Sequence, residues 1–388
     1  MSAGPVYLDH AATSFPKAPG VPEAAARFLR EEAGNAGRGA HALARAAADQ
    51  VEGARRALAG LLGARDPRRV ALFPGATWAL NAALRGLLQP ARQAAEQRVI
   101  RGPEAHNAVL RPLALLGREQ GVLVEEVASD DALRWDLTDL ERRLRAGPCA
   151  LVAVAHGSNL TGALQDLAAI AALCRAHGAR LLVDAAQTAG AVPLDADGLG
   201  IDLLACAGHK GLLGPTGTGA LVVGPGVSLR PCVVGGSGGD AEAEEMPTAL
   251  PAALEPGTPD ACAWAALRPA LAYVAETGPA ALHARAAAAG QRLREGLAAL
   301  PGVRLVGFER PEDLPVLALQ VEGWDPHELA AALDGVGVAA RAGLHCAPRA
   351  HRRVGTLSGG GALRLSPGPF LSLDQAELAL DRIREVLS

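Results

Sequence analysis

The chain has 388 residues, which is longer than one hydrophobic core commonly holds, so we expect two packed domains. Hydrophobic residues make up 49% and aromatic residues only 3%, a balance that predicts an alanine-rich helical protein with tight turns. The net charge of −4 is small and no block of Lys or Arg interrupts the chain. Nucleic acid and acidic membrane surfaces are therefore not expected partners, and small-molecule chemistry is favoured.

No stretch approaches the roughly 18 consecutive apolar residues of a membrane span, and the beginning MSAGPVYLDHAATSFPK lacks a basic segment followed by an apolar run. We therefore expect a cytoplasmic protein with no membrane partner. Six cysteines are scattered without any CxxC pair, a pattern that predicts reduced thiols and no metal site.

From about residue 20 to residue 260, short β-like runs alternate with alanine-rich helical stretches, which is typical of a mostly parallel sheet built from βαβ units. In such sheets the ligand lies beyond the carboxyl ends of the strands. The expected strands are Val70–Phe73, Val99–Ile100, Val122–Val127, Ala150–Ala155, Arg180–Val183, Leu203–Ala205 and Ala220–Val223.

The segment from Gly235–Gly239 to about Pro259 is expected to be an extended loop. Beyond it the pattern becomes α+β, which predicts a smaller domain completed by the N-terminal segment. We place the large domain at residues 17–262 and the small domain at residues 1–16 and 263–388. The elements expected in the small domain are a helix over Ala281–Leu300, a strand over Val316–Val321, a helix near Pro326–Leu333 and a helix from Leu373 onward.

Two titratable residues follow expected strands. Asp184 ends the strand Arg180–Val183, and Lys210 lies in a glycine-bracketed loop, GHKG, after Leu203–Ala205. A lysine that bonds to a cofactor aldehyde needs a constrained loop, and a carboxylate can keep a pyridine nitrogen protonated. Taken singly, each residue has an ordinary interpretation, since Asp184 could cap a helix and Lys210 could be solvated. The combination favours the cofactor site.

Three further segments carry candidate groups. Phe73–Thr77 turns from a strand into a helix, so its amides and Thr77 could hold a phosphate. His106 follows another strand, where its ring could stack on a flat cofactor, although most isolated histidines do not. Cys346 lies in RAGLHCAP beside His345, a potential cation that would favour the thiolate. The other five cysteines are expected to be small core residues.

Arg364 alternates with apolar residues in the strand-like segment GALRLS. An inward-facing guanidinium could bind a substrate carboxylate through two parallel hydrogen bonds. An interdomain salt bridge is the alternative role, and the residues alone leave both open.

Taken in order, these segments resemble the class V aminotransferase superfamily and, within it, cysteine desulfurases of the group with an RxGxHCAxP-like loop. The resemblance spans nearly the whole chain. It is carried by the stretches YLDHAATS, GNAGRGAH, GATWALN, HNAVLRPL, SNLTG, VDAAQTAG, GHKGLLGPTGTG, EPGTPD and RAGLHCAP and by the Arg364 strand. It implies the fold type I of pyridoxal 5′-phosphate (PLP) transferases, with a seven-stranded, mostly parallel sheet in a large PLP-binding domain and a smaller α+β domain.

The resemblance also implies a role for each site residue. Lys210 would bond to PLP, Asp184 would face the pyridine nitrogen, His106 would stack on the ring and Cys346 would accept the sulfur. Further PLP contacts would come from Ala76, Thr77, Asn159, Gln187, His209 and Thr258, with Thr258 reaching the phosphate of a neighbouring subunit in a homodimer. Arg364, Asn35 and Arg341 would receive the substrate carboxylate.

By this resemblance L-cysteine would become L-alanine while its sulfur passes to Cys346 as a persulfide, for delivery to an acceptor protein used in iron–sulfur cluster assembly or other sulfur chemistry. Three alternatives stay open: a selenocysteine or cystine lyase, another class V PLP enzyme, and a non-catalytic sulfur-relay partner. Ala207, Trp78 and Ala105 depart from common family residues near the phosphate and the ring, as His10 and the segment 366–371 do near the substrate.

Overall fold

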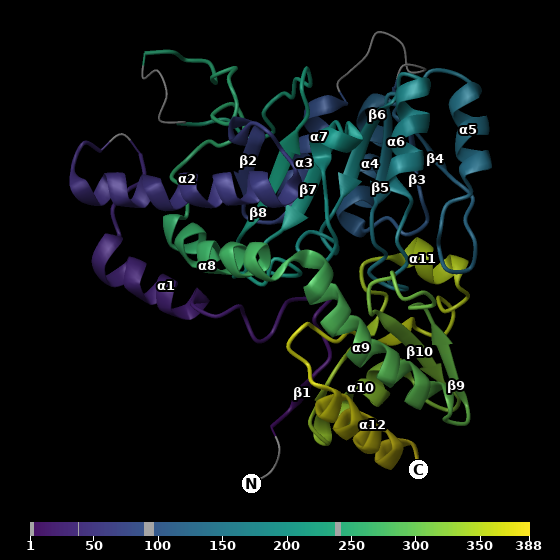
Figure 1. The fold of residues 1–388 in the computed structure, drawn as a ribbon. Coiled ribbons are helices and arrows are strands. Elements are labelled where there is room, and N and C mark those ends of the chain that lie inside the picture. Colours follow the sequence, from purple (N-terminus) through teal and green to yellow (C-terminus); the bar gives the residue numbers. More distant parts are fainter. Residues whose placement is uncertain (1–3, 38, 89–96, 237–241) are drawn as a thin grey trace.

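The computed structural model describes residues 4–37, 39–88, 97–236 and 242–388 (Figure 1). Its main sheet has seven strands in the order β2-β8-β7-β6-β5-β3-β4. The strands are β2 Val70–Phe73, β3 Arg98–Arg101, β4 Leu123–Glu126, β5 Leu151–Ala155, β6 Arg180–Asp184, β7 Leu203–Ala207 and β8 Gly219–Val223. All seven expected strands are confirmed, with ends that differ by at most two residues.

The five strands from β4 to β7 are mutually parallel, and only β8 runs antiparallel to its neighbours β7 and β2. β5, β6 and β7 are buried along their whole length or nearly so. For this reason β5, β7 and the middle of β6, Leu181–Val183, are continuous apolar runs rather than an alternating pattern. The predicted α/β fold with a mostly parallel seven-stranded sheet is therefore confirmed.

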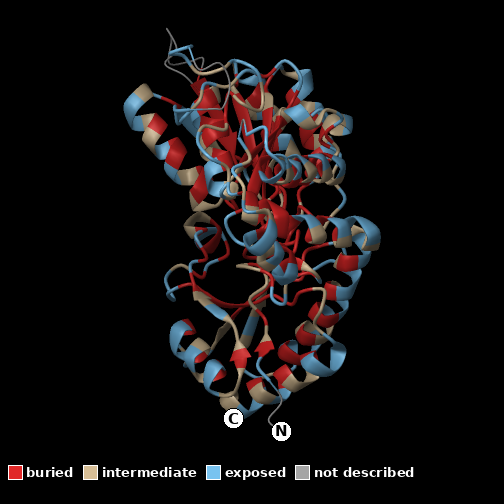
Figure 2. Cartoon of the chain, turned by 90° about the vertical axis from the view of Figure 1, so that its left-hand side faces the viewer, coloured by how far each residue is buried: buried red, intermediate tan, exposed pale blue. Residues whose placement is uncertain are grey.

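Helices cover both faces of this sheet (Figures 1 and 2). One apolar core lies between the sheet and helices α3 and α4, and the larger core lies on the other face. The described α-helices of this part of the chain are α1 Val21–Arg27, α2 Ala42–Leu62, α3 Ala76–Leu87, α4 Asn107–Gln120, α5 Leu137–Arg145, α6 Leu167–Ala176, α7 Ala196–Leu199 and α8 Ala261–Thr277.

A second, four-stranded antiparallel sheet has the order β12-β13-β10-β9 and packs with the C-terminal helices at the lower end of Figure 1. The N-terminal strand β1 pairs in parallel with β11, so the beginning of the chain joins this part as expected. The elements are β1 Val6–Tyr7, α9 Pro279–Ala298, β9 Val303–Val306, β10 Leu317–Val321, α10 Pro326–Gly335, β11 Val338–Ala339, β12 Arg341–Gly343, α11 Pro348–Arg353, β13 Ala362–Leu365 and α12 Leu373–Leu387.

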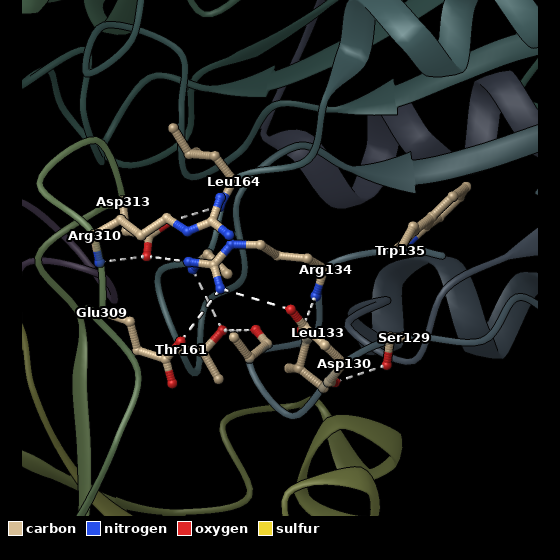
Figure 3. Close-up of polar contacts among 12 residues, drawn as sticks. Ser129, Asp130, Leu133, Arg134, Trp135, Thr161, Leu164, Glu309, Arg310 and Asp313 are labelled. Atoms are coloured by element: carbon tan, nitrogen blue, oxygen red, sulfur yellow. Dashed lines mark hydrogen bonds and ion pairs between the residues drawn. The ribbon is translucent and has the colours of Figure 1, made fainter. Parts of the chain in front are cut away.

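Ion pairs join the loop between β4 and α5 to the segment between β9 and β10 (Figure 3). The guanidinium of Arg134 contacts the carboxylates of both Glu309 and Asp313. Asp313 is buried, and its carboxylate also accepts hydrogen bonds from the backbone N–H groups of Leu164 (3.2 Å) and Arg310 (3.1 Å). These contacts hold the segment 309–313 against the large sheet's loops. The domain boundaries at residues 17 and 262 stay a prediction.

Over the described ranges, none of the helices combines the length and the apolar character needed to cross a bilayer. The expected loop from Gly235–Gly239 to Pro259 falls partly outside the described residues. Its described part carries only turns and bends, as expected.

Candidate active site

A cavity of about 500 Å³ opens beyond the carboxyl ends of the parallel strands. Eleven of the thirteen predicted site residues border this one space, although their positions span nearly 290 residues of sequence. They are Ala76, Thr77, His106, Asn159, Asp184, Gln187, His209, Lys210, Arg341, Cys346 and Arg364. This position at the strand ends is where the parallel topology places ligands.

Lys210 lies in the tight loop between β7 and β8. The Gly208 N–H bonds to the Thr218 carbonyl at 2.8 Å, and a Cβ at Gly208 would come within 2.1 Å of the Thr218 hydroxyl, so this close approach requires glycine. Burial lowers the pKa of Lys210 to about 8, while the negative charge of Asp184 opposes that shift. The amine can therefore lose and regain a proton near neutral pH.

Asp184 is the last residue of β6 and is buried. Its carboxylate accepts a hydrogen bond from the Ala186 N–H at 3.0 Å. Because β6 lies between β5 and β7, its end is central in the sheet, and Asp184 reaches the same cavity as Lys210. The structure therefore brings together the carboxylate and the amine that the sequence singled out.

His106 is the N-cap residue of α4, and its Nδ1 accepts the Ala108 N–H at 3.0 Å. Burial lowers the pKa of His106, with Asp184 opposing and Lys210 adding to the shift. The ring is therefore neutral, and its acceptor role at Nδ1 places the hydrogen on Nε2.

The N-terminus of α3 faces the cavity through Ala76 and Thr77, and its N-cap residue Gly75 offers no side chain to the free amides. These amides form a ready anion site, as expected from the strand-turn-helix segment. A Cβ at Gly219 would lie 2.5 Å from the Gly75 carbonyl carbon. Strand β8 can therefore approach this turn only because residue 219 is a glycine.

Arg364 is 2% exposed and lies on β13, opposite Arg341 of β12. One Nη of Arg364 donates to the Asn159 carbonyl at 3.0 Å and the other to Asp9 at 3.1 Å, while its buried Nε has no partner. Arg341, which is half exposed, also pairs with Asp9 at 3.0 Å. The guanidinium thus makes a salt bridge and still keeps one buried donor without a partner in the described structure.

Cys346 is exposed at the cavity, and its carbonyl accepts the Asn107 N–H at 2.8 Å. The expected cation beside it is wrong. His345 is buried with Nε2 3.1 Å from the Ala362 carbonyl, and burial lowers the pKa of His345 to about 2, so this ring is neutral. Lys210 and Arg341 are cations that interact electrostatically with Cys346.

Two predicted site residues do not border the cavity. Asn35 is exposed and its side chain accepts the Gly37 N–H, while Thr258 is exposed on the segment before α8. Among the other cysteines, Cys149, Cys174 and Cys206 are buried as expected, and Cys262 is half-buried. Cys232 is exposed, so the expectation that it is a core residue is wrong.

Glu104 is a cavity residue that the sequence did not single out. It is buried, and its two carboxylate oxygens accept the Trp135 indole N–H at 2.9 Å and the Ala155 N–H at 3.3 Å. Burial raises the pKa of Glu104 to about 7 despite these hydrogen bonds. Its position directly after β3 was the only available signal, and its partner Trp135 lies 31 residues away.

The raised pKa of Glu104 predicts a pH dependence of stability. Below about pH 4.5 the carboxyl is protonated in both states and its contribution is fully present. Between pH 4.5 and 7 the unfolded chain releases a proton that the folded protein keeps, so the free energy of unfolding falls with rising pH, by up to about 3 kcal/mol. Urea unfolding at pH 5 and pH 7.5 should show a smaller difference for Glu104→Gln than for the unchanged protein. Equal differences would contradict this assignment.

The aminotransferase class-V model matches residues 6–377. The chain belongs to the aminotransferase class-V family. A probable cysteine desulfurase of Methanothermobacter thermautotrophicus is 30% identical over 98% of this class-V chain and 94% of the relative. Another, from Mycolicibacterium paratuberculosis, is 33% identical over 90% of the chain, which spans only 51% of that relative's length.

Solved structures agree with the family assignment. The apo cysteine desulfurase of Thermococcus onnurineus superposes on this class-V protein with a TM-score of 0.89 at 28% identity, covering 98% of this chain and 94% of that one. The cysteine desulfurase CsdA of Escherichia coli gives a TM-score of 0.86 at 28% identity, with 99% and 94% coverage. The predicted resemblance to the cysteine desulfurases is therefore confirmed.

Proposed function

We propose that the protein is a PLP-dependent cysteine desulfurase, which converts L-cysteine to L-alanine and collects the sulfur on Cys346. The observation that carries this proposal is the exposed Cys346 at the same cavity as Lys210 and Asp184. A thiol in that position is the group that separates a desulfurase from a PLP enzyme that only eliminates sulfur.

The residues present fit PLP. Lys210 supplies the amine, Asp184 a carboxylate for the pyridine nitrogen, and the free amides of α3 with Thr77 a place for the phosphate. The buried Nδ1 of His209 has no partner within the described structure and would face the same anion. His106 would lie against the ring, with Asn159 and Gln187 near its oxygen; when bound, PLP would accept the electron pair that the substrate's Cα–H bond leaves behind.

The chain's own groups then account for the remaining chemistry. The unpartnered Nε of Arg364 would bind the substrate carboxylate. The Lys210 amine, with its pKa near 8, would take the Cα proton and return a proton to the product. The Cys346 thiolate would attack the substrate sulfur, so that an S–S bond forms while the carbon–sulfur bond breaks, leaving alanine and a persulfide on Cys346.

Three further predictions belong to this proposal. Thr258 is exposed and does not border the cavity of its own subunit, which is consistent with a role at the phosphate of a neighbouring subunit in a homodimer. The persulfide sulfur would pass to an acceptor protein, and we propose a cytoplasmic location. We also keep residues 17–262 as the PLP-binding domain, with 1–16 and 263–388 as the small domain.

The direct test mixes the protein with PLP and L-cysteine and measures both alanine and protein-bound persulfide. We expect Cys346→Ala to abolish the persulfide and to lower the rate of alanine formation from L-cysteine by about 10²-fold or more, since the acceptor of the sulfur is lost. Cys232→Ala is the matched control, because Cys232 is the other exposed cysteine in the described ranges, and it should retain both products. If the unchanged protein and Cys346→Ala released alanine at the same rate and neither carried a persulfide, the result would instead support a lyase.

A further inference from the structure

Lys17 is a basic residue that the proposed reaction does not use. Only two of the 37 basic residues of the chain are lysines, Lys17 and Lys210, and all the others are arginines. Lys17 lies in the segment that follows β1, 193 positions before Lys210 in sequence. The two hydroxyls that Lys17 contacts nevertheless also contact the loop of Lys210. A lysine ammonium is compact and donates in three directions, which the flat fork of arginine does not reproduce.

The Lys17 ammonium donates hydrogen bonds to the hydroxyl oxygens of Thr13 (3.1 Å) and Ser14 (3.0 Å). No carboxylate forms an ion pair with Lys17 in the part of the chain that the structure describes. The amine is half-buried, and burial lowers the pKa of Lys17 to about 8. Burying a charged group without a counter-ion costs free energy, so the charged form of Lys17 depends on the hydrogen bonds to these two hydroxyls.

Both hydroxyls in turn contact the carbonyl oxygen of His209, the residue before Lys210. The distances are 3.1 Å from the Thr13 hydroxyl and 3.2 Å from the Ser14 hydroxyl, and the Ser14 N–H also donates to this oxygen at 2.7 Å. An ammonium can only donate, so each hydroxyl must accept from Lys17 and direct its own hydrogen to His209. Hydrogen bonds arranged in such a chain strengthen one another.

The same segment is fixed on the other side of Lys210. The Ala18 N–H donates to the Leu213 carbonyl at 3.1 Å, and the Leu213 N–H donates to the Lys210 carbonyl at 2.9 Å. The N-terminal segment therefore holds the Lys210 loop at both its entry and its exit. Of these contacts, only the two hydroxyl contacts at the entry involve side chains, and both hydroxyls accept a hydrogen bond from Lys17.

We propose that Lys17 is a positioning residue for Lys210: through the Thr13 and Ser14 hydroxyls it fixes the His209 carbonyl, and with it the peptide that presents the Lys210 amine. The proposal rests on the proposed function only in taking PLP as the group that Lys210 binds. The contact itself exists in the protein without PLP and can be tested there.

The experiment compares the full-length protein with Lys17→Met, with Thr13→Val/Ser14→Ala, and with all three changes combined. Amide hydrogen exchange is followed without PLP at Ser14 and Leu213, whose N–H groups bond to residues 209 and 210. The dissociation constant of PLP is then measured from the visible absorbance of the bound cofactor. We expect Lys17→Met to speed exchange at Ser14 and to weaken PLP binding, each by about tenfold, while exchange at Leu213, whose contacts are between backbone groups, stays unchanged. Because Lys17 acts through the hydroxyls, we expect the combined variant to be no worse than either parent.

Arg30→Met is the matched control, since Arg30 is an exposed base of the same N-terminal region that bonds only the Ala26 carbonyl among its described contacts. It should change neither measurement. Unchanged exchange at Ser14 in Lys17→Met, or effects that add in the combined variant, would overturn the proposal. If Lys17→Met does not fold, the hydroxyl variant alone decides, because it should show the same faster exchange. Failure of the unchanged protein to bind PLP would refute the proposed function and leave the exchange result standing.

Discussion

Lys210→Ala is expected to lower alanine production from L-cysteine by about 10³-fold or more, the largest effect of any single substitution in this protein. The substitution removes the amine that would hold the cofactor and also the base that would move the Cα proton, and a positioned acid-base group alone contributes about 10²- to 10⁴-fold. No other described amine lines the cavity to replace it. The measurement is the rate of alanine release at saturating PLP.

The composition of the chain allows a direct readout of the same residue. Borohydride reduction fixes PLP to the lysine it has joined, and peptide mass spectrometry then identifies that lysine. Because Lys17 is the only other lysine, it serves as the internal control. We expect the adduct on Lys210 alone, and no adduct in Lys210→Ala. An adduct on Lys17, or a loss of activity smaller than tenfold, would contradict the role of Lys210.

Arg364→Met is expected to lower kcat/KM for L-cysteine by about 10²- to 10³-fold, mainly through KM, while PLP affinity stays nearly unchanged. The guanidinium is buried, and the loss of one partner of a buried, hydrogen-bonded charge pair, here the pair with the substrate carboxylate, commonly costs about 2 to 5 kcal/mol of binding free energy. The free Nε that would meet the substrate carboxylate is lost as well. Steady-state kinetics and PLP titration on the same preparation provide the two measurements.

Arg341→Met is the matched comparison, because Arg341 pairs with the same Asp9 but its side chain is 52% exposed. Exposed pairs contribute about 1 kcal/mol or less, so we expect a loss in kcat/KM of no more than about tenfold. Losses of equal size in the two variants would contradict the assignment of Arg364 as the main carboxylate-binding residue. A parallel fall in PLP affinity for Arg364→Met would indicate a structural role instead.

The sequence was sufficient to predict the parallel sheet and the positions of Asp184 and Lys210. Buried parallel strands consist of short continuous apolar runs, so each strand and its polar end are visible locally. The glycines around Lys210 are also local signals, since Gly208 allows the close contact with Thr218. These features require no knowledge of which segments meet in space.

The tertiary structure alone decided the electrostatic state of the site. His345 is adjacent to Cys346 in sequence and was expected to be a cation, but packing against the Ala362 carbonyl buries it and keeps it neutral. Asp9 neutralises Arg364 across 355 positions of sequence, and Glu104 meets Trp135 across 31. Burial and charge pairing are set by segments distant in the chain, so the residue types at one position do not reveal them. The Thr13 and Ser14 hydroxyls that Lys17 contacts meet the Lys210 loop for the same reason, because only folding brings the N-terminal segment against it.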